Sequence, residues 1–221
     1  MGIAGSGGGG IKTAPVLTIA KKWVFSAHHD SVTVPRAERL TSALVRQIGS
    51  AASLLDVGAG DGVIAKKVGE RVGAERVEGV DVLLRPKRVI RVREYDGTSL
   101  PFESGAFEVV TISDVLHHCE DPEAVLRECL RVAERLVVIK DHFAFGKMSR
   151  RLLHLMDVVG NARDGIPSPG RYFEPHEWVA MIERANGRIL GLEWPLAMHE
   201  WPWRLVVRPG LHFVAKVEPR R

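Results

Sequence analysis

The chain has 221 residues, of which 45% are hydrophobic, and a formal net charge of +4. This length and apolar content suffice for one sizeable core, and the lack of any run of about 18 apolar residues argues against a membrane-spanning helix. With only two cysteines, Cys119 and Cys129, the chain lacks a disulfide framework, which favours a reducing, cytoplasmic compartment.

Residues 1–20 begin with the glycine-rich stretch MGIAGSGGGG. This stretch lacks the charged and apolar regions of a secretory signal peptide, so we expect a flexible leader there and a single domain over residues 21–221. Lys and Arg outnumber Asp and Glu in residues 1–50 and 143–173, whereas acids are in excess in residues 51–142. Most such imbalances reflect a solvated surface, but basic segments around an acidic middle also suit an anionic ligand.

Strand and helix patterns alternate from residue 35 onward. Buried-strand patterns cover residues 52–57, 76–82, 89–96, 107–115, 135–141, 188–194 and 211–217. Helix patterns cover residues 35–49, 61–73, 120–133 and 174–187. In the third helix, Asp121 is the expected N-cap and Pro122 the first helical residue. Alternation of this kind predicts an α/β fold, with a mostly parallel sheet and helices on both of its faces.

An acidic residue stands at the end of each of the first five predicted strands. These residues are Asp56, Asp81, Asp96, Asp114 and Asp141. In open parallel sheets, ligands bind beyond the carboxyl ends of the strands, where the strand order reverses. A single such acid is as often a helix cap or a solvated carboxylate, whereas five in succession indicate a polar ligand site at this edge.

The glycine-rich turn in LLDVGAGDG allows two functional interpretations. Gly58 and Gly60 suit a backbone that a ligand approaches closely, and Asp81 follows Gly60 by 21 residues, as in a dinucleotide site. The dinucleotide fingerprint G-x-G-x-x-G requires a third glycine at Val63, whereas this chain has it one residue earlier, at Gly62. The mismatch disfavours a dinucleotide-dependent oxidoreductase, which stays an alternative.

Four features in succession carry a resemblance to a known family: LLDVGAGDG, Asp81 after the second strand, YDGTSLPF and FEVVTISDVLHHCEDPEAVLREC. In order and spacing they resemble the motifs of class I S-adenosylmethionine-dependent methyltransferases, in the small-molecule branch that includes the ubiquinone-biosynthesis methyltransferases. The resemblance covers residues 54–139. It implies a Rossmann-like sheet of seven strands, mostly parallel, with the last strand antiparallel. One departure is the short spacing between Asp81 and Asp96, which leaves room only for a turn where the family has a helix.

The resemblance implies that the cofactor is S-adenosylmethionine. The glycine backbone would approach its methionine portion, Asp81 would accept from its ribose hydroxyls, and Asp96 would accept from its adenine amino group. The backbone carbonyl of Ser113 would face the methionine ammonium, with Asp56 and Asp114 assisting. The expected cofactor-binding residues are Asp56, Gly58, Gly60, Asp81, Val82, Asp96, Gly97, Ser113 and Asp114.

Three histidines at the ligand edge are candidate general bases for a hydroxyl acceptor: His118, which we favour, then His142 and His117. A purely structural role is the alternative for each, and no metal ligand set is expected. Residues 143–173 form a long insert that we expect to act as a lid and to select the acceptor. Its basic charge favours an anionic acceptor, and the candidate acceptor contacts are Tyr172, Arg151, Arg171 and, from the N-terminal segment, His29.

The expected function is methyl transfer from S-adenosylmethionine to a small-molecule acceptor, with O-methylation favoured and N- or C-methylation left open. A second alternative is a non-catalytic S-adenosylmethionine-binding protein with a regulatory role, because its binding motifs would look the same. A nucleic-acid acceptor is disfavoured, since SDVLHH stands where base-methylating enzymes have an Asn/Asp-Pro-Pro-aromatic stretch.

Overall fold

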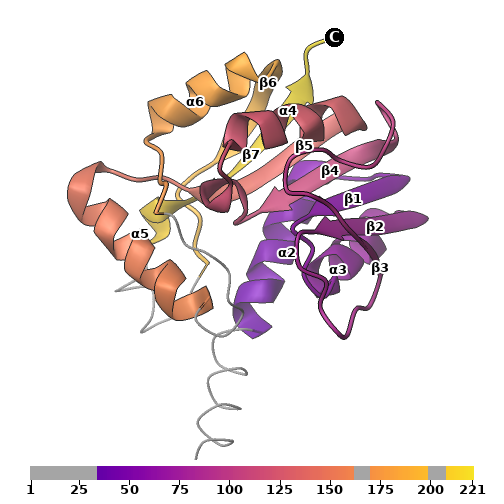
Figure 1. The fold of residues 1–221 in the computed structure, drawn as a ribbon, viewed down its shortest axis with the longest axis horizontal. Coiled ribbons are helices and arrows are strands. Elements are labelled where there is room, and N and C mark those ends of the chain that lie inside the picture. The colour runs from indigo at the N-terminus through magenta and orange to yellow at the C-terminus, as the bar shows by residue number, and fades with distance from the viewer. Residues whose placement is uncertain (1–33, 162–169, 199–207) are drawn as a thin grey trace, which may run out of the picture.

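The computed structural model describes residues 34–161, 170–198 and 208–221. The expected leader and His29 lie outside these residues. In the described part of the chain, seven strands form one sheet in the order β3-β2-β1-β4-β5-β7-β6 (Figure 1). The strands are β1 Ser53–Val57, β2 Arg76–Asp81, β3 Arg91–Glu94, β4 Phe107–Ser113, β5 Ala133–His142, β6 Gly187–Glu193 and β7 His212–Pro219.

The strand directions confirm the expected Rossmann-like architecture. The pairs β3–β2, β2–β1, β1–β4 and β4–β5 are parallel, whereas β7 runs antiparallel to both of its neighbours, β5 and β6. The last strand of the chain is therefore the reversed one, as the resemblance implied.

Helices cover both faces of the sheet. Helices α2 (Val34–Ile48) and α3 (Val63–Val72) pack on one face, and α4 (Pro122–Val132) and α6 (Pro175–Arg184) pack on the other (Figure 1). Helix α5 (Gly146–Asn161) lies apart from both layers (Figure 1). Of the helices in the described residues, none combines the length and the apolar character that a membrane span requires.

The central strands read as continuous apolar runs because both faces of the sheet are buried. Successive side chains point to opposite faces. Leu54 and Val109 pack into the core under α2 and α3, and their neighbours Leu55 and Val110 pack into the core under α4 and α6. All four side chains are fully buried.

The helix ends follow the signals in the sequence. Asp121 is the N-cap of α4, as expected, and its Oδ1 accepts a hydrogen bond of 3.0 Å from the Ala124 N–H. Gly73 ends α3 in the left-handed conformation, with φ at 75°. A capping box formed by Glu174 and Glu177 opens α6.

The bounds of β3, β5 and β6 differ from the expected ones, because hydrogen bonds to other segments set where these strands begin and end. Strand β3 is limited to Arg91–Glu94, because the preceding Val89 N–H donates to the Asp61 carbonyl, at 2.9 Å, in the glycine turn. No helix stands between β2 and β3, as the short spacing predicted. Strand β5 extends to His142 because its second half also pairs with β7. Strand β6 begins at Gly187, which was expected to close the preceding helix.

The insert contains one helix, α5, with the expected apolar face at Leu152, Leu153, Met156 and Val159. Leu153 is buried in a small core with Tyr172 and Leu211. The side chain of Val159 lies outside the described residues, and Leu152 and Met156 are half-buried. The division into a leader, one domain and a lid over 143–173 stays a prediction.

Candidate functional site

The order of the strands reverses between β1 and β4, and in sheets of this kind a ligand crevice opens at the carboxyl ends of two such strands. The structure places the five acids of the strand ends at this edge: Asp56, Asp81, Asp96, Asp114 and Asp141. Their surroundings differ, so each carboxylate has a different role available to it.

The turn after β1 passes through three left-handed glycines, with φ of 76° at Gly58, 58° at Gly60 and 80° at Gly62. A Cβ on Gly58 would lie 2.3 Å from a methyl carbon of Val115, and one on Gly62 would lie 2.4 Å from the side chain of Ile90. These two glycines are required by packing. Among the described residues, apart from Gly60 and its two chain neighbours, no atom lies within 4 Å of the Cβ position at Gly60, so this side of its backbone is open to a ligand.

A cavity of about 670 Å³ opens beside this turn, lined by Ala59, Gly60, Asp61, Arg85, Pro86 and Lys87. The Asp81 carboxylate is fixed next to it: Oδ2 accepts from the Gly60 N–H at 2.8 Å, and Oδ1 accepts from the Leu83 N–H at 3.0 Å. The neighbouring Val82 is exposed. The glycine turn and the end of β2 therefore form one polar cradle.

Asp96 lies in a turn at the surface. Its Oδ1 accepts from the Ser99 N–H at 2.7 Å and from the Thr98 N–H at 2.8 Å, and these bonds hold the pKa of the carboxyl below its usual value. Gly97 is left-handed, and a Cβ there would lie 3.3 Å from Val82. Asp96 thus closes its own turn beside Val82, next to the end of β2.

Asp56 is buried, and its Oδ1 accepts a hydrogen bond of 2.7 Å from the Thr111 hydroxyl. Burial, and to a smaller extent the nearby Asp81, raise the pKa of Asp56 to about 7, although the bond from Thr111 opposes the shift. This carboxyl keeps its proton far above its usual range, and a cation beside it would favour the ionised form.

Asp114, directly after β4, has a left-handed backbone with φ at 57°. Its carboxylate pairs with the Lys140 ammonium and, at 2.6 Å, with the Arg36 guanidinium from α2. Burial opposes ionisation, but these two cations hold the pKa of Asp114 well below its usual range. Lys140 is fully buried, and the hydroxyl oxygen of the adjacent Ser113 is buried without a hydrogen-bond partner in the described structure.

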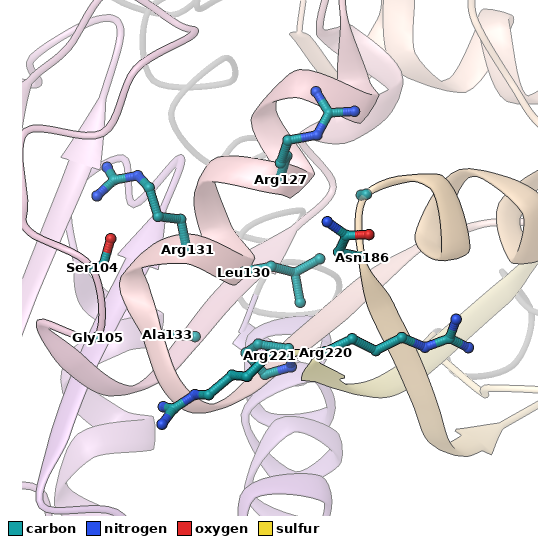
Figure 2. Close-up of a pocket in the computed structure, with 11 residues that line it drawn as sticks. Ser104, Gly105, Arg127, Leu130, Arg131, Ala133, Asn186, Arg220 and Arg221 are labelled. Atoms are coloured by element: carbon teal, nitrogen blue, oxygen red, sulfur yellow. The ribbon is translucent and has the colours of Figure 1, made fainter.

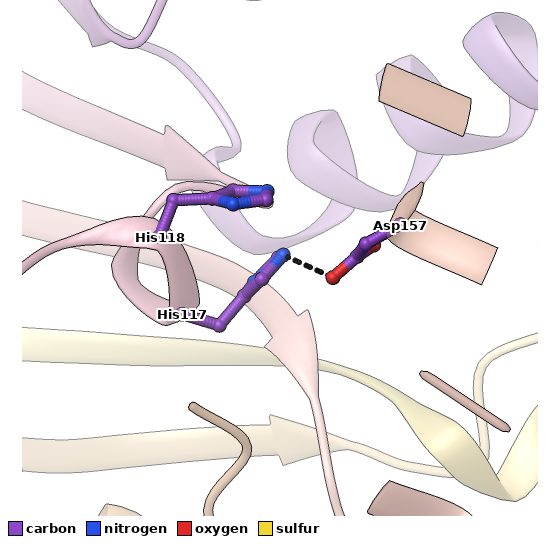
Figure 3. Close-up of side chains that lie close together, drawn as sticks. All are labelled: His117, His118 and Asp157. Atoms are coloured by element: carbon purple, nitrogen blue, oxygen red, sulfur yellow. Dashed lines mark ion pairs between the residues drawn. The ribbon is translucent and has the colours of Figure 1, made fainter. Parts of the chain in front are cut away.

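His117 is held between two carboxylates. Its Nδ1 lies 2.7 Å from Asp141 Oδ1, and its Nε2 lies 3.2 Å from Asp157 Oδ2 of α5 (Figure 3). Burial opposes the charged form, but the two carboxylates raise the pKa of His117 to about 10. The Tyr172 hydroxyl donates to the same Asp157 oxygen. A cationic imidazole has no lone pair for a proton, so His117 suits a structural role better than that of a base.

The other two candidate bases differ in exposure. His118 is half-buried, and its ring centroid lies 4.1 Å from that of His117. His142 is buried; burial and the nearby Lys140 lower its pKa. Its backbone carbonyl accepts a hydrogen bond of 2.9 Å from the Trp178 indole. His118 is therefore the most accessible imidazole of the three.

Within the part of the chain that the structure describes, two sets of side chains have ligand atoms within 4.8 Å of one another and could hold a cation: His117, His118 and Asp157, and His117, Asp141 and His142. The first set faces a common space (Figure 3). The expectation of a site without metal stays a prediction.

The candidate acceptor contacts are dispersed. Tyr172 is buried in the His117–Asp157 cluster. Arg171 donates to the backbone carbonyl of Glu120, which fixes the end of the insert to the segment that precedes α4. Arg151 is exposed on α5.

Other hollows in the described structure lie away from the glycine turn, and two of them differ in their lining. One, of about 280 Å³, is lined by apolar side chains of α6, β6 and the segment after β5. The other, of about 470 Å³, lies at the amino end of β5 and contains Arg127, Arg131, Arg220 and Arg221. Figure 2 shows these guanidinium groups pointing away from one another around Leu130, so they do not converge on an anion.

Sequence reasoning missed four side chains of the site: Lys140, Arg36, Asp157 and Thr111. Lys140 carried a signal, because a lysine inside the apolar run RLVVIKD needs a buried partner. Arg36 and Asp157 gave none, since their partners are far away along the chain.

Comparisons with known proteins point to one group. Residues 55–136 match the family described as "Methyltransferase domain". A ubiquinone biosynthesis O-methyltransferase of Vibrio campbellii is 27% identical over 158 residues, which cover 63% of this chain and 65% of that protein. One of Yersinia enterocolitica is 31% identical over 169 residues, which cover 66% and 67%. The chain thus spans about two thirds of the length of these relatives.

Solved structures agree in fold. The YcgJ protein from Bacillus subtilis has a TM-score of 0.58 at 16% identity, covering 82% of this chain and 98% of that one. The 1,6-didemethyltoxoflavin-N1-methyltransferase of Burkholderia thailandensis, solved with S-adenosylhomocysteine, has a TM-score of 0.59 at 15% identity, covering 96% and 92%. At these identities the likeness concerns the fold alone.

Proposed function

The chain belongs to the class I S-adenosylmethionine-dependent methyltransferases, and on this premise we propose that it transfers the cofactor's methyl group to a small-molecule acceptor. The observation that carries the proposal is the cradle formed by the glycine turn and the end of β2, next to the switch point between β1 and β4. There, the N–H of Gly60 donates a hydrogen bond to the Asp81 carboxylate beside a cavity of about 670 Å³, and the backbone of Gly60 is open on its Cβ side.

The residues at this edge fit S-adenosylmethionine. A Cβ at Gly60 would fill space that is open, and the buried Ser113 hydroxyl oxygen lacks a partner in the described structure. Asp81 would hold the ribose hydroxyls, and Asp96, with Val82 and Gly97 beside it, would hold the adenine. The remaining proposed contacts, to the methionine portion, are Asp56, Gly58, Ser113 and Asp114.

When bound, the cofactor supplies an activated methyl group on a sulfonium, from which the neutral thioether is a good leaving group. The protein's task is then mainly to orient the acceptor, which can contribute about 7–11 kcal/mol to lowering a barrier. For a hydroxyl acceptor a general base adds roughly 10²–10⁴-fold. His118 is the proposed base because it is the most accessible of the three histidines, and His142 is the second candidate. His117 pairs with Asp141 and Asp157, so its proposed role is structural.

An oxygen acceptor is favoured by the similarity to relatives that are named O-methyltransferases. The insert 143–173 is proposed to close over the acceptor, with Tyr172, Arg151, Arg171 and His29 as contacts. An anionic acceptor is supported by the net basic charge of this insert.

Titration calorimetry tests the cofactor assignment. S-adenosylhomocysteine should bind with a Kd in the micromolar range, which corresponds to about −8 kcal/mol, whereas NAD should not bind. Formation of S-adenosylhomocysteine in the presence of hydroxylated aromatic acids then tests turnover. Binding without turnover across a broad panel of acceptors would favour the regulatory alternative.

A further inference from the structure

Asp114 is one of two non-glycine residues with positive φ among the described residues. The left-handed conformation strains a residue with a Cβ, and such strain persists only where the surroundings determine the backbone. Asp114 lies between Ser113, the last residue of β4, and Val115, so its conformation sets the direction of the chain at the switch point.

Asp114 is held by its backbone and by its carboxylate, which also lies 3.6 Å from His142 Nδ1. Its N–H donates to the Lys140 carbonyl at 2.8 Å. Its Oδ1 pairs with the ammonium of the same lysine, and its Oδ2 pairs with Arg36 at 2.6 Å. Lys140 is fully buried, and Arg36 reaches over from α2, so the carboxylate is anchored to two separate elements.

The next residue connects this turn to the glycine turn. Val115 lies where a Cβ of Gly58 would be, with 2.3 Å between that position and its Cγ2. Any change in the backbone at Asp114 therefore moves Val115 against or away from Gly58. The glycine turn after β1, which forms part of the cradle, and the turn after β4 therefore depend on each other.

We infer that Lys140 and Arg36 are positioning residues, which act through the Asp114 carboxylate and keep the backbone of Asp114 left-handed. This conformation in turn keeps the Ser113 carbonyl and the Gly58 backbone in the positions that the cofactor requires. The inference deepens the proposed function and rests on it for the identity of the ligand. The competing explanation is that Asp114 serves only to neutralise a buried lysine.

The two explanations differ in what a glycine at position 114 does, because glycine adopts the left-handed conformation without strain whereas alanine does not. The variants Asp114→Gly/Lys140→Met and Asp114→Ala/Lys140→Met both remove the carboxylate and the buried ammonium together. They differ only in the Cβ at position 114. Neither leaves the lysine charge buried without a partner.

The experiment measures S-adenosylhomocysteine affinity by calorimetry. We expect Lys140→Met to weaken binding at least 10-fold and Arg36→Met to weaken it as well. The control Arg46→Met, which removes an ion pair of 2.6 Å with Glu193 elsewhere on α2, should bind as wild type does. The glycine double variant should bind at least 10-fold more tightly than the alanine double variant, because the two differ only in the Cβ at the left-handed position 114.

Equal affinity of the two double variants, or wild-type affinity of Lys140→Met, would overturn the inference. If Lys140→Met does not fold, the comparison of the two double variants still decides. A wild-type protein that binds no S-adenosylhomocysteine would contradict the proposed function instead. In that case the urea midpoints of the double variants test the conformational claim: the glycine variant must be the more stable of the two.

Discussion

Replacing Asp56 with Asn should stabilise the protein more at pH 8 than at pH 5. The buried carboxyl has its pKa raised from 3.8 to about 7, so its ionised form is disfavoured in the fold. The contribution of the Asp56 carboxyl to the free energy of unfolding is greatest below pH 3.8, falls as the pH rises from 3.8 to about 7, and stays constant above pH 7. Asn is neutral throughout and keeps an oxygen for the Thr111 hydroxyl, which donates at 2.7 Å.

The magnitude follows from the shift. A difference of about 3 pKa units is worth about 4 kcal/mol at full ionisation, since one unit corresponds to 1.36 kcal/mol. At pH 5 the unfolded chain already binds fewer protons than the folded one, so part of this loss is present there. The gain of Asp56→Asn over wild type should therefore grow by about 2–3 kcal/mol between pH 5 and pH 8.

Urea unfolding of both proteins at the two pH values measures this growth. Titrations of other groups affect both proteins equally and cancel in the comparison. A gain that is the same at pH 5 and pH 8 would show that Asp56 ionises in the fold as it does in the unfolded chain, and would refute the reasoning from burial.

Three further predictions concern the turn, the base and the insert. Urea unfolding should show that Gly58→Ala lowers the free energy of unfolding by about 1–3 kcal/mol more than Gly105→Ala does. Both glycines have positive φ, but only at Gly58 would the added Cβ contact another side chain, that of Val115. Equal losses would contradict the close packing of Val115 against Gly58. His118→Ala should lower turnover of a hydroxyl acceptor by about 10²-fold in steady-state assays and leave S-adenosylhomocysteine affinity unchanged, whereas full activity would assign the base elsewhere. Arg151→Ala should raise the KM for an anionic acceptor at low salt, with little effect at high salt; a KM that does not respond to salt would remove the charge argument for the insert.

Local signals predicted the parts of the fold and site that a short stretch determines. The glycine turn, the N-cap Asp121 and the acids at the strand ends follow from single strand–turn–helix units, and the structure has them there. The reversed last strand was implied by resemblance to a known family and is confirmed by the pairing of β7.

Interactions between distant segments were not predictable in this way. The group formed by Arg36, Asp114 and Lys140 joins α2, the turn after β4 and β5, and no local pattern links these positions. His117 was a candidate base on its sequence position, but its pKa is raised by Asp141 at the end of β5 and, to a smaller extent, by Asp157 of α5, and both carboxylates are far from it along the chain. The properties of an ionisable group depend on such partners, so sequence position alone could not separate His117 from His118.

The central claim is that the cradle at Gly60 and Asp81 binds S-adenosylmethionine, and calorimetry of three proteins with S-adenosylhomocysteine tests it most directly. Wild type and the control Glu94→Ala, which removes an exposed acid paired in register with Asp81 on β3, should bind with the same Kd in the micromolar range. Asp81→Ala should bind at least about 10-fold more weakly, because the ribose hydroxyls lose a charged acceptor. Undiminished binding by Asp81→Ala, or binding of NAD in place of S-adenosylhomocysteine, would contradict the account.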